Sequence, residues 1–275
     1  IECGICKKIC AFQKENLSTI KACYAAVSCD KHRLKKSASG GLFSAIAESF
    51  LKNGGIVCGA QMTFSEGRAQ VKHVAIDNIR DLERLQGSKY VQSDIKELFE
   101  STLEQLKQGK KVLFSGTPCQ VTALKRFVGM KYAENLYALD IICHGVPNIQ
   151  FFNDYIETNF TRKSIILQKF TFRDKKYGWG VRGSFNGVNA QKEEITEKMD
   201  SDTSSYYRYF LKGETYRDSC YHCPFAQENR AGDLTLGDYW GVERFDPELL
   251  EKNGGPFQEQ EGVSCLMVNN AKGET

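Results

Sequence analysis

The sequence has no long apolar run and no large excess of charge of either sign. Its apolar stretches are far shorter than the roughly 18 residues that a membrane-spanning helix needs, so no membrane span is expected. Lys and Arg number 37, and Asp and Glu number 34, giving a net charge of +3 over 275 residues. This balance argues against a strongly basic nucleic-acid binder and against an acidic tail. The composition predicts a soluble protein of one large domain or two modest ones.

Histidine is scarce, and some familiar cysteine spacings are missing. The chain has four histidines, none placed as the base of a cysteine protease. It lacks the C-x3-C-x2-C run of radical-SAM enzymes, and no internal repeat is visible. These absences exclude two enzyme classes and the repeat architectures.

Cysteine, by contrast, is abundant, with eleven residues. The number is odd and the residues lie in short clusters, unlike the disulfide framework of a small secreted domain. Clustered thiols in a chain of this length indicate metal or redox chemistry in a reducing compartment. We therefore expect a cytoplasmic protein.

The first cluster is C-x2-C-x3-C, formed by Cys3, Cys6 and Cys10. It matches the last three cysteines of the ferredoxin run C-x2-C-x2-C-x3-C, and the missing first cysteine is expected immediately before Ile1. A zinc knuckle is the alternative. Residues 1–30 are interpreted as the end of a ferredoxin-like 4Fe-4S module with its linker, in which Cys23 and Cys29 are small buried residues.

Residues 31–275 are expected to form an α/β domain that is truncated at its C-terminus. The apolar patterns predict helices at 42–51, 94–107, 118–128 and 148–160, and strands at 56–64, 71–76, 111–115, 136–142 and 263–268. Thr117 is expected to cap its helix, with Pro118 at the first helical position. The segment 110–160 thus forms a parallel βαβα unit. Residues 164–200 are predicted as an antiparallel excursion, followed by a short aromatic helix.

Two cysteines follow the strands of this unit directly. Cys119 and Cys143 each lie past the carboxyl end of a strand, and parallel strands bring those ends to one ligand-binding edge. The two thiols are therefore predicted to be neighbours, although each alone would suit a buried structural position. A second ligand-type motif is Cys220-x2-Cys223, followed by Pro224.

Taken in order, the motifs resemble those of the coenzyme F420 hydrogenase/dehydrogenase beta-subunit family. They are Ser39-Gly40-Gly41, Gly87-Ser88-Lys89-Tyr90-Val91-Gln92-Ser93, Gly116-Thr117-Pro118-Cys119-Gln120, Cys143-His144-Gly145, Cys220-x2-Cys223 and Gly237-Asp238-Tyr239-Trp240-Gly241. Each motif alone is weak, but the ordered set is specific and covers roughly residues 1–245. The resemblance implies an FAD-bearing α/β domain with a nearby 4Fe-4S cluster, supplied with electrons by the N-terminal module.

The resemblance assigns four cysteines to the inner cluster: Cys119, Cys143, Cys220 and Cys223. Topology alone joins only the first two. Cys58 and Cys265 are the rival ligands, but both lie in apolar strand-like segments and are interpreted as core thiols.

For FAD, the resemblance points to three segments. Ser39, Gly40 and Gly41 open a helix after a basic run, where backbone amides suit a pyrophosphate; a capped surface helix is the alternative. Lys89, Tyr90 and Ser93 are predicted to supply charge, stacking and a hydroxyl, unless they form an ordinary polar loop. Thr117 and Gln120 are predicted to contact flavin beside the cluster.

Histidines adjoin two of the assigned cysteines. His144 and His222 would tune the cluster or donate a proton, or would simply satisfy a local carbonyl; His144 is the candidate catalytic residue. Arg173, Lys175 and Trp179 suit either a pocket for an anionic or sugar-like substrate or a solvated hairpin. Asp233 and Asp238 are interpreted as turn and strand-end residues without a catalytic role.

The sequence thus predicts an iron–sulfur flavoprotein oxidoreductase that passes electrons from reduced ferredoxin or another donor, through 4Fe-4S and FAD, to a small-molecule hydride acceptor. F420 is one possible acceptor, and an unassigned substrate, for example in polysaccharide synthesis, is another. A homo-oligomer is possible. Two other classes remain open: a non-catalytic electron-transfer subunit and a zinc-binding interaction module.

Overall fold

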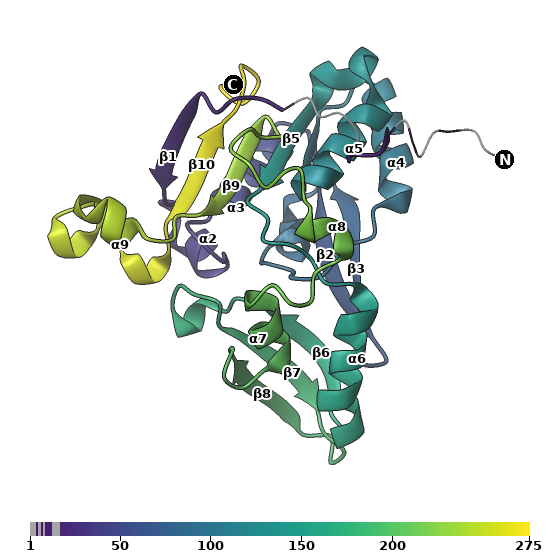
Figure 1. Cartoon of the computed structure of the whole chain (residues 1–275), viewed down its shortest axis with the longest axis vertical. Helices are drawn as coiled ribbons and strands as arrows, with labels where there is room; N and C mark the ends of the chain where they lie inside the picture. Colours follow the sequence, from purple (N-terminus) through teal and green to yellow (C-terminus); the bar gives the residue numbers. More distant parts are fainter. Residues whose placement is uncertain (1–3, 5–6, 8, 13–16) are drawn as a thin grey trace.

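The main body of the protein is a seven-stranded mixed sheet. The computed structural model describes residues 4, 7, 9–12 and 17–275. The strand order is β1-β10-β9-β5-β4-β2-β3 (Figure 1). The strands are β1 (Ala22–Ala26), β2 (Ile56–Ser65), β3 (Arg68–Ile76), β4 (Val112–Gly116), β5 (Leu136–Ile141), β9 (Leu234–Asp238) and β10 (Ser264–Val268).

The centre of the sheet is parallel and its edges are antiparallel. Strand β4 pairs in parallel with β2 and β5, and β5 pairs in parallel with β9. Strands β3, β10 and β1 run antiparallel to their neighbours. The carboxyl ends of β4, β5 and β9 therefore meet at one edge, as predicted for the βαβα unit.

Helices cover both faces of this sheet. On one face, α4 (Lys96–Lys107) and α5 (Pro118–Val128) pack on alternate residues of β2, β4 and β5. On the other face, α3 (Leu42–Lys52) and the 3-10 helix η1 (Ile79–Leu85) pack on the intervening residues. The period-2 alternation of the strands explains this, because successive side chains point to opposite faces. The result is a three-layer α/β domain.

A smaller, three-stranded antiparallel sheet adjoins the main one. It has the order β6 (Ile166–Thr171), β7 (Gly183–Val188), β8 (Glu194–Met199). Helices α6 (Ile149–Asn159) and α7 (Ser205–Leu211) flank it, and the three strands and two helices enclose an aromatic core (Figure 1). Phe152 and Phe172, both fully buried, lie at its centre. This unit is the antiparallel excursion predicted from the sequence.

The remaining elements are short. They are the helices α2 (Lys31–Lys35), α8 (Asp218–Tyr221) and α9 (Val242–Phe245), and the 3-10 helices η2 (Met130–Asn135), η3 (Thr161–Lys163), η4 (Lys175–Tyr177), η5 (Pro247–Leu249), η6 (Glu251–Asn253) and η7 (Glu259–Glu261). Helix α8 lies between the two sheets (Figure 1). It carries Cys220 and so brings the C-x2-C motif towards the carboxyl edge of the main sheet.

Two expectations about cysteines are wrong. Cys23 and Cys29, predicted to be buried, are exposed. Cys23 lies on β1, an edge strand on which Cys23 and the next residue, Tyr24, are both exposed although they point to opposite faces of the sheet. Cys265 is half-buried rather than a core thiol, whereas Cys58 is fully buried as expected.

Candidate functional site: a four-cysteine centre at the sheet edge

Four thiols from three chain segments converge at the carboxyl edge of the sheet. Cys119 stands in the first turn of α5, Cys143 follows β5, and Cys220 and Cys223 lie on and just after α8. The charges of Cys119, Cys220 and Cys223 each act on Cys143, raising its pKa. Such mutual effects require the four sulfurs to be neighbours. The structure thus places the four cysteines that the resemblance assigned to a cluster within electrostatic reach of one another.

Burial and the charges of neighbouring thiols raise the pKa of two of these cysteines, Cys143 and Cys119. Burial of its sulfur raises the pKa of Cys143 to about 12, although the residue keeps an exposed surface. Burial also raises the pKa of Cys119, with smaller contributions from Cys223 and Cys220. A metal ion would reverse this, because its charge displaces the protons of coordinating thiols.

Backbone amides point at two of the sulfurs. The Gln120 N–H donates to Cys119 and the Gly145 N–H donates to Cys143. In the described part of the chain no three His, Cys, Asp or Glu side chains already stand in metal-holding geometry. The donor set nevertheless fits a cubane cluster, which takes four thiolates and is tuned by hydrogen bonds to sulfur.

Residues 10–12 lie against the apolar cluster on which this centre rests. Ala11, next to Cys10, is buried in the same apolar cluster as Cys119 and Cys223. The Phe12 ring meets the Phe225 ring edge-on, with centroids 6.3 Å apart. Cys10 is half-buried, and the predicted ligands Cys3 and Cys6 lie outside the described residues.

Thr117, Gln120 and Ser93, predicted to contact flavin, bond to one another. Thr117 Oγ1 lies 3.1 Å from Cys119 Sγ, and the Thr117 N–H donates to Gln120 Oε1 over 3.1 Å. Gln120 Nε2 donates to Ser93 Oγ over 2.9 Å, and Ser93 Oγ lies 2.8 Å from His73 Nδ1. The N-cap predicted for Thr117 is therefore part of a polar chain that reaches the sheet interior.

His73 lies at the inner end of this series of hydrogen bonds. Its Nε2 lies 3.0 Å from the Ser115 carbonyl, which can only accept, so Nε2 carries the proton and Nδ1 accepts from Ser93. Burial lowers the pKa of His73 to about 4, keeping the ring neutral. The ring stacks on Phe114, with centroids 5.2 Å apart. Sequence reasoning missed His73, since an alternating strand gives no sign of a polar partner.

Lys89 and Tyr90 form a second polar group beside the small sheet. Lys89 Nζ donates to the carbonyls of Leu85 and Gln86, at 3.0 and 2.7 Å. Burial lowers the pKa of Lys89 to about 7. The Tyr90 ring stacks on Phe210, with centroids 4.6 Å apart, and burial raises its pKa.

The segment Ser39–Gly41 is held by the β1–β10 edge. Ser39 Oγ donates to the Val263 carbonyl over 3.0 Å. A Cβ on Gly40 would lie 2.4 Å from the Ala26 carbonyl oxygen, and Gly41 takes a left-handed φ of 84° at the N-cap of α3. Glycine is thus required at position 40 because a Cβ would not fit, and at position 41 because of the left-handed backbone. Neither requirement depends on a ligand.

Arg173 and Asp238 join the small sheet to β9. Arg173 donates through both terminal nitrogens to Asp238, one contact being 2.8 Å, and Trp179 Nε1 donates to the same carboxylate over 2.7 Å. Trp179 stacks on Trp240, with centroids 4.5 Å apart. Lys175 Nζ donates to the Ser39 carbonyl over 2.9 Å. The sequence analysis assigned Arg173, Lys175 and Trp179 either to a substrate pocket or to a solvated hairpin. In the structure Lys175 contacts Ser39, and Arg173 lies close to Tyr90.

His144 lies at the exposed rim of the cysteine centre. Its Nδ1 is hydrogen-bonded to Tyr216 Oη, which donates to the Phe210 carbonyl over 2.8 Å. A Cβ on Gly145, whose φ is 123°, would lie 2.5 Å from the Tyr216 ring. The glycine of the Cys143-His144-Gly145 motif therefore allows Tyr216 to approach. His222 is also exposed.

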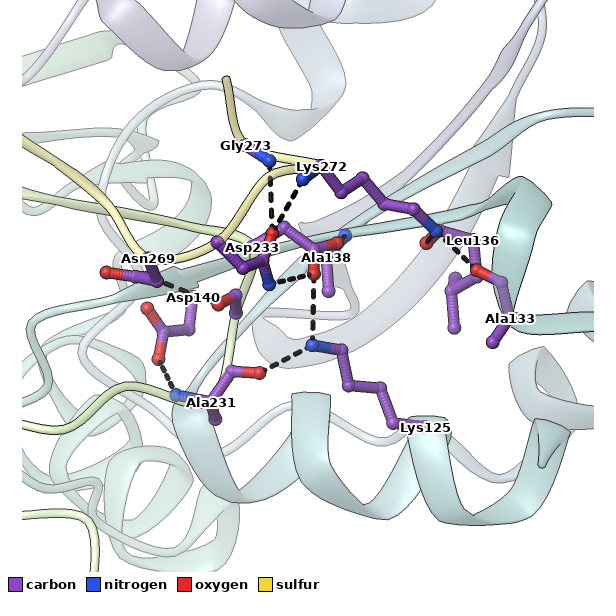
Figure 2. Close-up of polar contacts among 12 residues, drawn as sticks. Lys125, Ala133, Leu136, Ala138, Asp140, Ala231, Asp233, Asn269, Lys272 and Gly273 are labelled. Carbon is purple, nitrogen blue, oxygen red and sulfur yellow. Dashed lines mark hydrogen bonds and ion pairs between the residues drawn. The ribbon is translucent and has the colours of Figure 1, made fainter. Parts of the chain in front are cut away.

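Buried charges fix the elements that carry the cysteines. Lys125, on α5, donates to the Ala231 carbonyl over 2.7 Å and pairs with Asp233, which also accepts from the Ala138 N–H (Figure 2). Asp140 on β5 pairs with Arg230 at 3.4 Å. Asp233 is thus structural, as expected, and it anchors α5 to β9.

Family models match most of the chain. Residues 23–100 match the N-terminal part, and residues 109–275 the C-terminal part, of the coenzyme F420 hydrogenase/dehydrogenase beta subunit. The chain belongs to this beta-subunit family. The resemblance seen in the sequence is thereby confirmed, and membership makes the protein an electron-transfer oxidoreductase of the hydrogenase/dehydrogenase type.

A solved structure has the same fold as this beta-subunit chain. It is a chain of the F420-reducing [NiFe] hydrogenase complex from Methanosarcina barkeri, 18% identical, with a TM-score of 0.58. The alignment covers 95% of this chain and 80% of that chain. No curated protein sequence matches. Among its described residues, this beta-subunit chain has no helix long and apolar enough to cross a membrane.

Proposed function

We propose that the protein is an iron–sulfur flavoprotein that passes electrons from a ferredoxin-type donor through a 4Fe-4S cluster and FAD to a small organic hydride acceptor. The acceptor is F420 or another small molecule of comparable redox chemistry. The convergence of Cys119, Cys143, Cys220 and Cys223 on one sheet edge carries this proposal. Four thiols from three separate chain segments lie within electrostatic reach of one another, and four is the number of thiolates that a cubane cluster takes.

The contact between Phe12 and Phe225 supports electron entry from the N-terminal side. Ala11 packs beside Cys119 and Cys223, and the Cys10 carbonyl accepts from Arg126. Cys10 thus belongs to a segment that rests against the four-cysteine centre. A cluster held by Cys3, Cys6 and Cys10 would lie next to the inner one in this arrangement.

The polar groups around Tyr90 support a flavin on the other side of the centre. FAD supplies the exchange between one-electron and two-electron transfer. Lys89, with its lowered pKa, and Lys175, whose pKa burial lowers to about 8, would gain an anionic partner from the cofactor. Tyr90 offers a ring face, and Ser39–Gly41 offers backbone amides at the N-terminus of α3.

His144 is the residue that would move a proton at this site. The Tyr216 hydroxyl donates to the Phe210 carbonyl and so accepts from Nδ1, which leaves Nε2 as the ring nitrogen that can exchange a proton. The exposed ring connects this position to solvent. His144 would therefore resupply the proton that accompanies hydride transfer.

Anaerobic purification with a visible spectrum and iron, sulfide, zinc and flavin analysis tests the proposal. Iron, acid-labile sulfide and FAD in one brown-yellow protein would support it. A colourless protein that holds zinc and no flavin would overturn it in favour of a structural module. Turnover of a small acceptor by the isolated chain separates an enzyme from a subunit that only relays electrons.

A further inference from the structure

Two cysteines outside the four-cysteine centre are in contact at the opposite edge of the sheet. Cys23 on β1 and Cys265 on β10 have their sulfurs 3.5 Å apart, although 242 positions separate them in the chain. Cys23 is opposite Met267, and Cys265 is opposite Ala25. The two thiols are therefore diagonal neighbours on one face of an antiparallel pair.

The two thiols differ in a way that suits thiol–disulfide exchange. Cys23 is exposed and Cys265 is half-buried, and both are free. Burial and the hydrogen bond to Cys23 together raise the pKa of Cys265 to about 12. Cys265 is therefore the protected thiol of the pair, and the exposed Cys23 sulfur is the one that an external disulfide can reach. The accessible sulfur is thus the nucleophile, and the protected one is placed to resolve its adduct.

We propose that Cys23 and Cys265 form a reversible dithiol site, oxidised by small-molecule disulfides. The Cys23 thiolate attacks one sulfur of the disulfide and releases one small thiol. Cys265 then loses its proton and attacks Cys23 Sγ, forming the Cys23–Cys265 bond and releasing the second thiol. The protein loses two electrons and two protons, and the disulfide gains them. This site is independent of the proposed iron–sulfur function.

The position of β1 makes closure of the bond feasible. The sulfurs must approach from 3.5 Å to about 2.05 Å. Strand β1 is at the sheet edge and pairs with β10 alone, so it can shift without disturbing a second neighbour.

The bond would tie two functional segments together. Strand β1 follows the N-terminal cysteine run, and β10 begins at Ser264, which a Cβ on Gly40 would contact. Oxidation would thereby fasten the N-terminal segment to the strand that supports Ser39–Gly41. Disulfides in reducing compartments are usually of this transient, redox-responsive kind.

The test exposes the intact protein, purified anaerobically, to 2-hydroxyethyl disulfide. Samples are quenched in acid, alkylated with N-ethylmaleimide and mapped by peptide mass. We expect a Cys23–Cys265 linked peptide that dithiothreitol reverses, and a melting temperature higher by about 5 °C in the oxidised protein. Exposed Cys29 serves as an internal control, which should keep a reagent adduct.

Matched variants separate the two thiols. Cys265→Ser should trap the adduct on Cys23 at about tenfold the wild-type level, because no resolving thiol remains. Cys29→Ser should still form the linked peptide. The proposal fails if wild-type Cys23 keeps its adduct as Cys29 does, or if Cys23 links to Cys29 as often as to Cys265. Both readouts are masses, so they do not depend on whether iron or flavin is bound.

Discussion

Gln120 Nε2 donates to Ser93 Oγ over 2.9 Å and thereby connects the first turn of α5 with the segment after η1. The Gln120 side chain also accepts from the Thr117 N–H, so one amide group closes the helix cap and joins it to Ser93. In the sequence, Cys119 lies between Thr117, the N-cap of α5, and Gln120. The position of Cys119, a proposed cluster ligand, is thus fixed by the Gln120 side-chain amide, whose oxygen and nitrogen are both hydrogen-bonded.

Removal of that amide should loosen the site. Gln120→Ala leaves the Thr117 N–H without its acceptor and Ser93 Oγ without one of its two partners, which should cost about 2 kcal/mol of unfolding free energy. Urea denaturation measures the loss. A double-mutant cycle with Ser93→Ala should give a coupling of at least about 0.5 kcal/mol, and additive effects would contradict the direct bond.

His73 should make the protein sensitive to acid. The unfolded chain protonates this histidine near pH 6.5, whereas the folded protein does so only near pH 4. Between these values the unfolded state binds more protons, so stability falls as pH decreases, by about 3 kcal/mol in total. His73→Gln should lower stability at pH 7 but flatten this part of the curve. An unchanged slope between pH 6.5 and 4, measured by urea unfolding, would contradict the buried neutral ring.

Cys220→Ala should remove the proposed inner cluster. Losing one of four thiolates leaves the cube without a ligand, so iron and acid-labile sulfide should each fall by about four atoms per chain. Cys58→Ala is the matched control, because Cys58 is a fully buried thiol on β2 whose sulfur lies 4.0 Å from Thr102 Oγ1 on α4 and is not one of the four proposed ligands. Equal iron loss in both variants would indicate general destabilisation rather than ligand removal.

The N-terminal segment should be held down by Phe12. Phe12→Ala removes the edge-on contact with Phe225, worth about 1 kcal/mol, so trypsin cleavage after Lys7 should speed up by roughly fivefold. Phe245→Ala, at an aromatic residue that is 66% exposed on α9, should leave the rate unchanged. Reduction of the inner cluster by reduced ferredoxin should slow in the first variant only.

Asp238 should hold the small sheet to the main one. Asp238→Asn leaves the Arg173 guanidinium, whose side chain is 4% exposed, without its counter-charge, which should cost about 3 kcal/mol. Asp81→Asn breaks an exposed pair with Arg84 and should change stability little. Calorimetry reads out both. We also expect lower flavin content in Asp238→Asn, since Arg173 faces Tyr90.

Much of the fold follows from local pattern. The strand at 112–116, Thr117 before Pro118 and the helix to Val128 can be predicted because alternation, capping and helical spacing act over a few residues. The same patterns predict the βαβα unit and therefore the proximity of Cys119 and Cys143. Only the family resemblance predicted that Cys220 and Cys223 lie close to Cys119 and Cys143, because no local pattern determines where α8 packs.

The exposure of Cys23 and Cys29, the contact between Cys23 and Cys265, and the buried position of His73 could not be predicted in this way. Each depends on which strands become neighbours, and β1 pairs with a strand that begins more than 200 residues later. A short segment has no information about a partner so far along the chain. Amino-acid order alone therefore specified the ligand types, the local elements and the family. Long-range strand pairing decided which thiols meet in the four-cysteine centre and which form a separate pair, because side-chain proximity is a property of the assembled sheet.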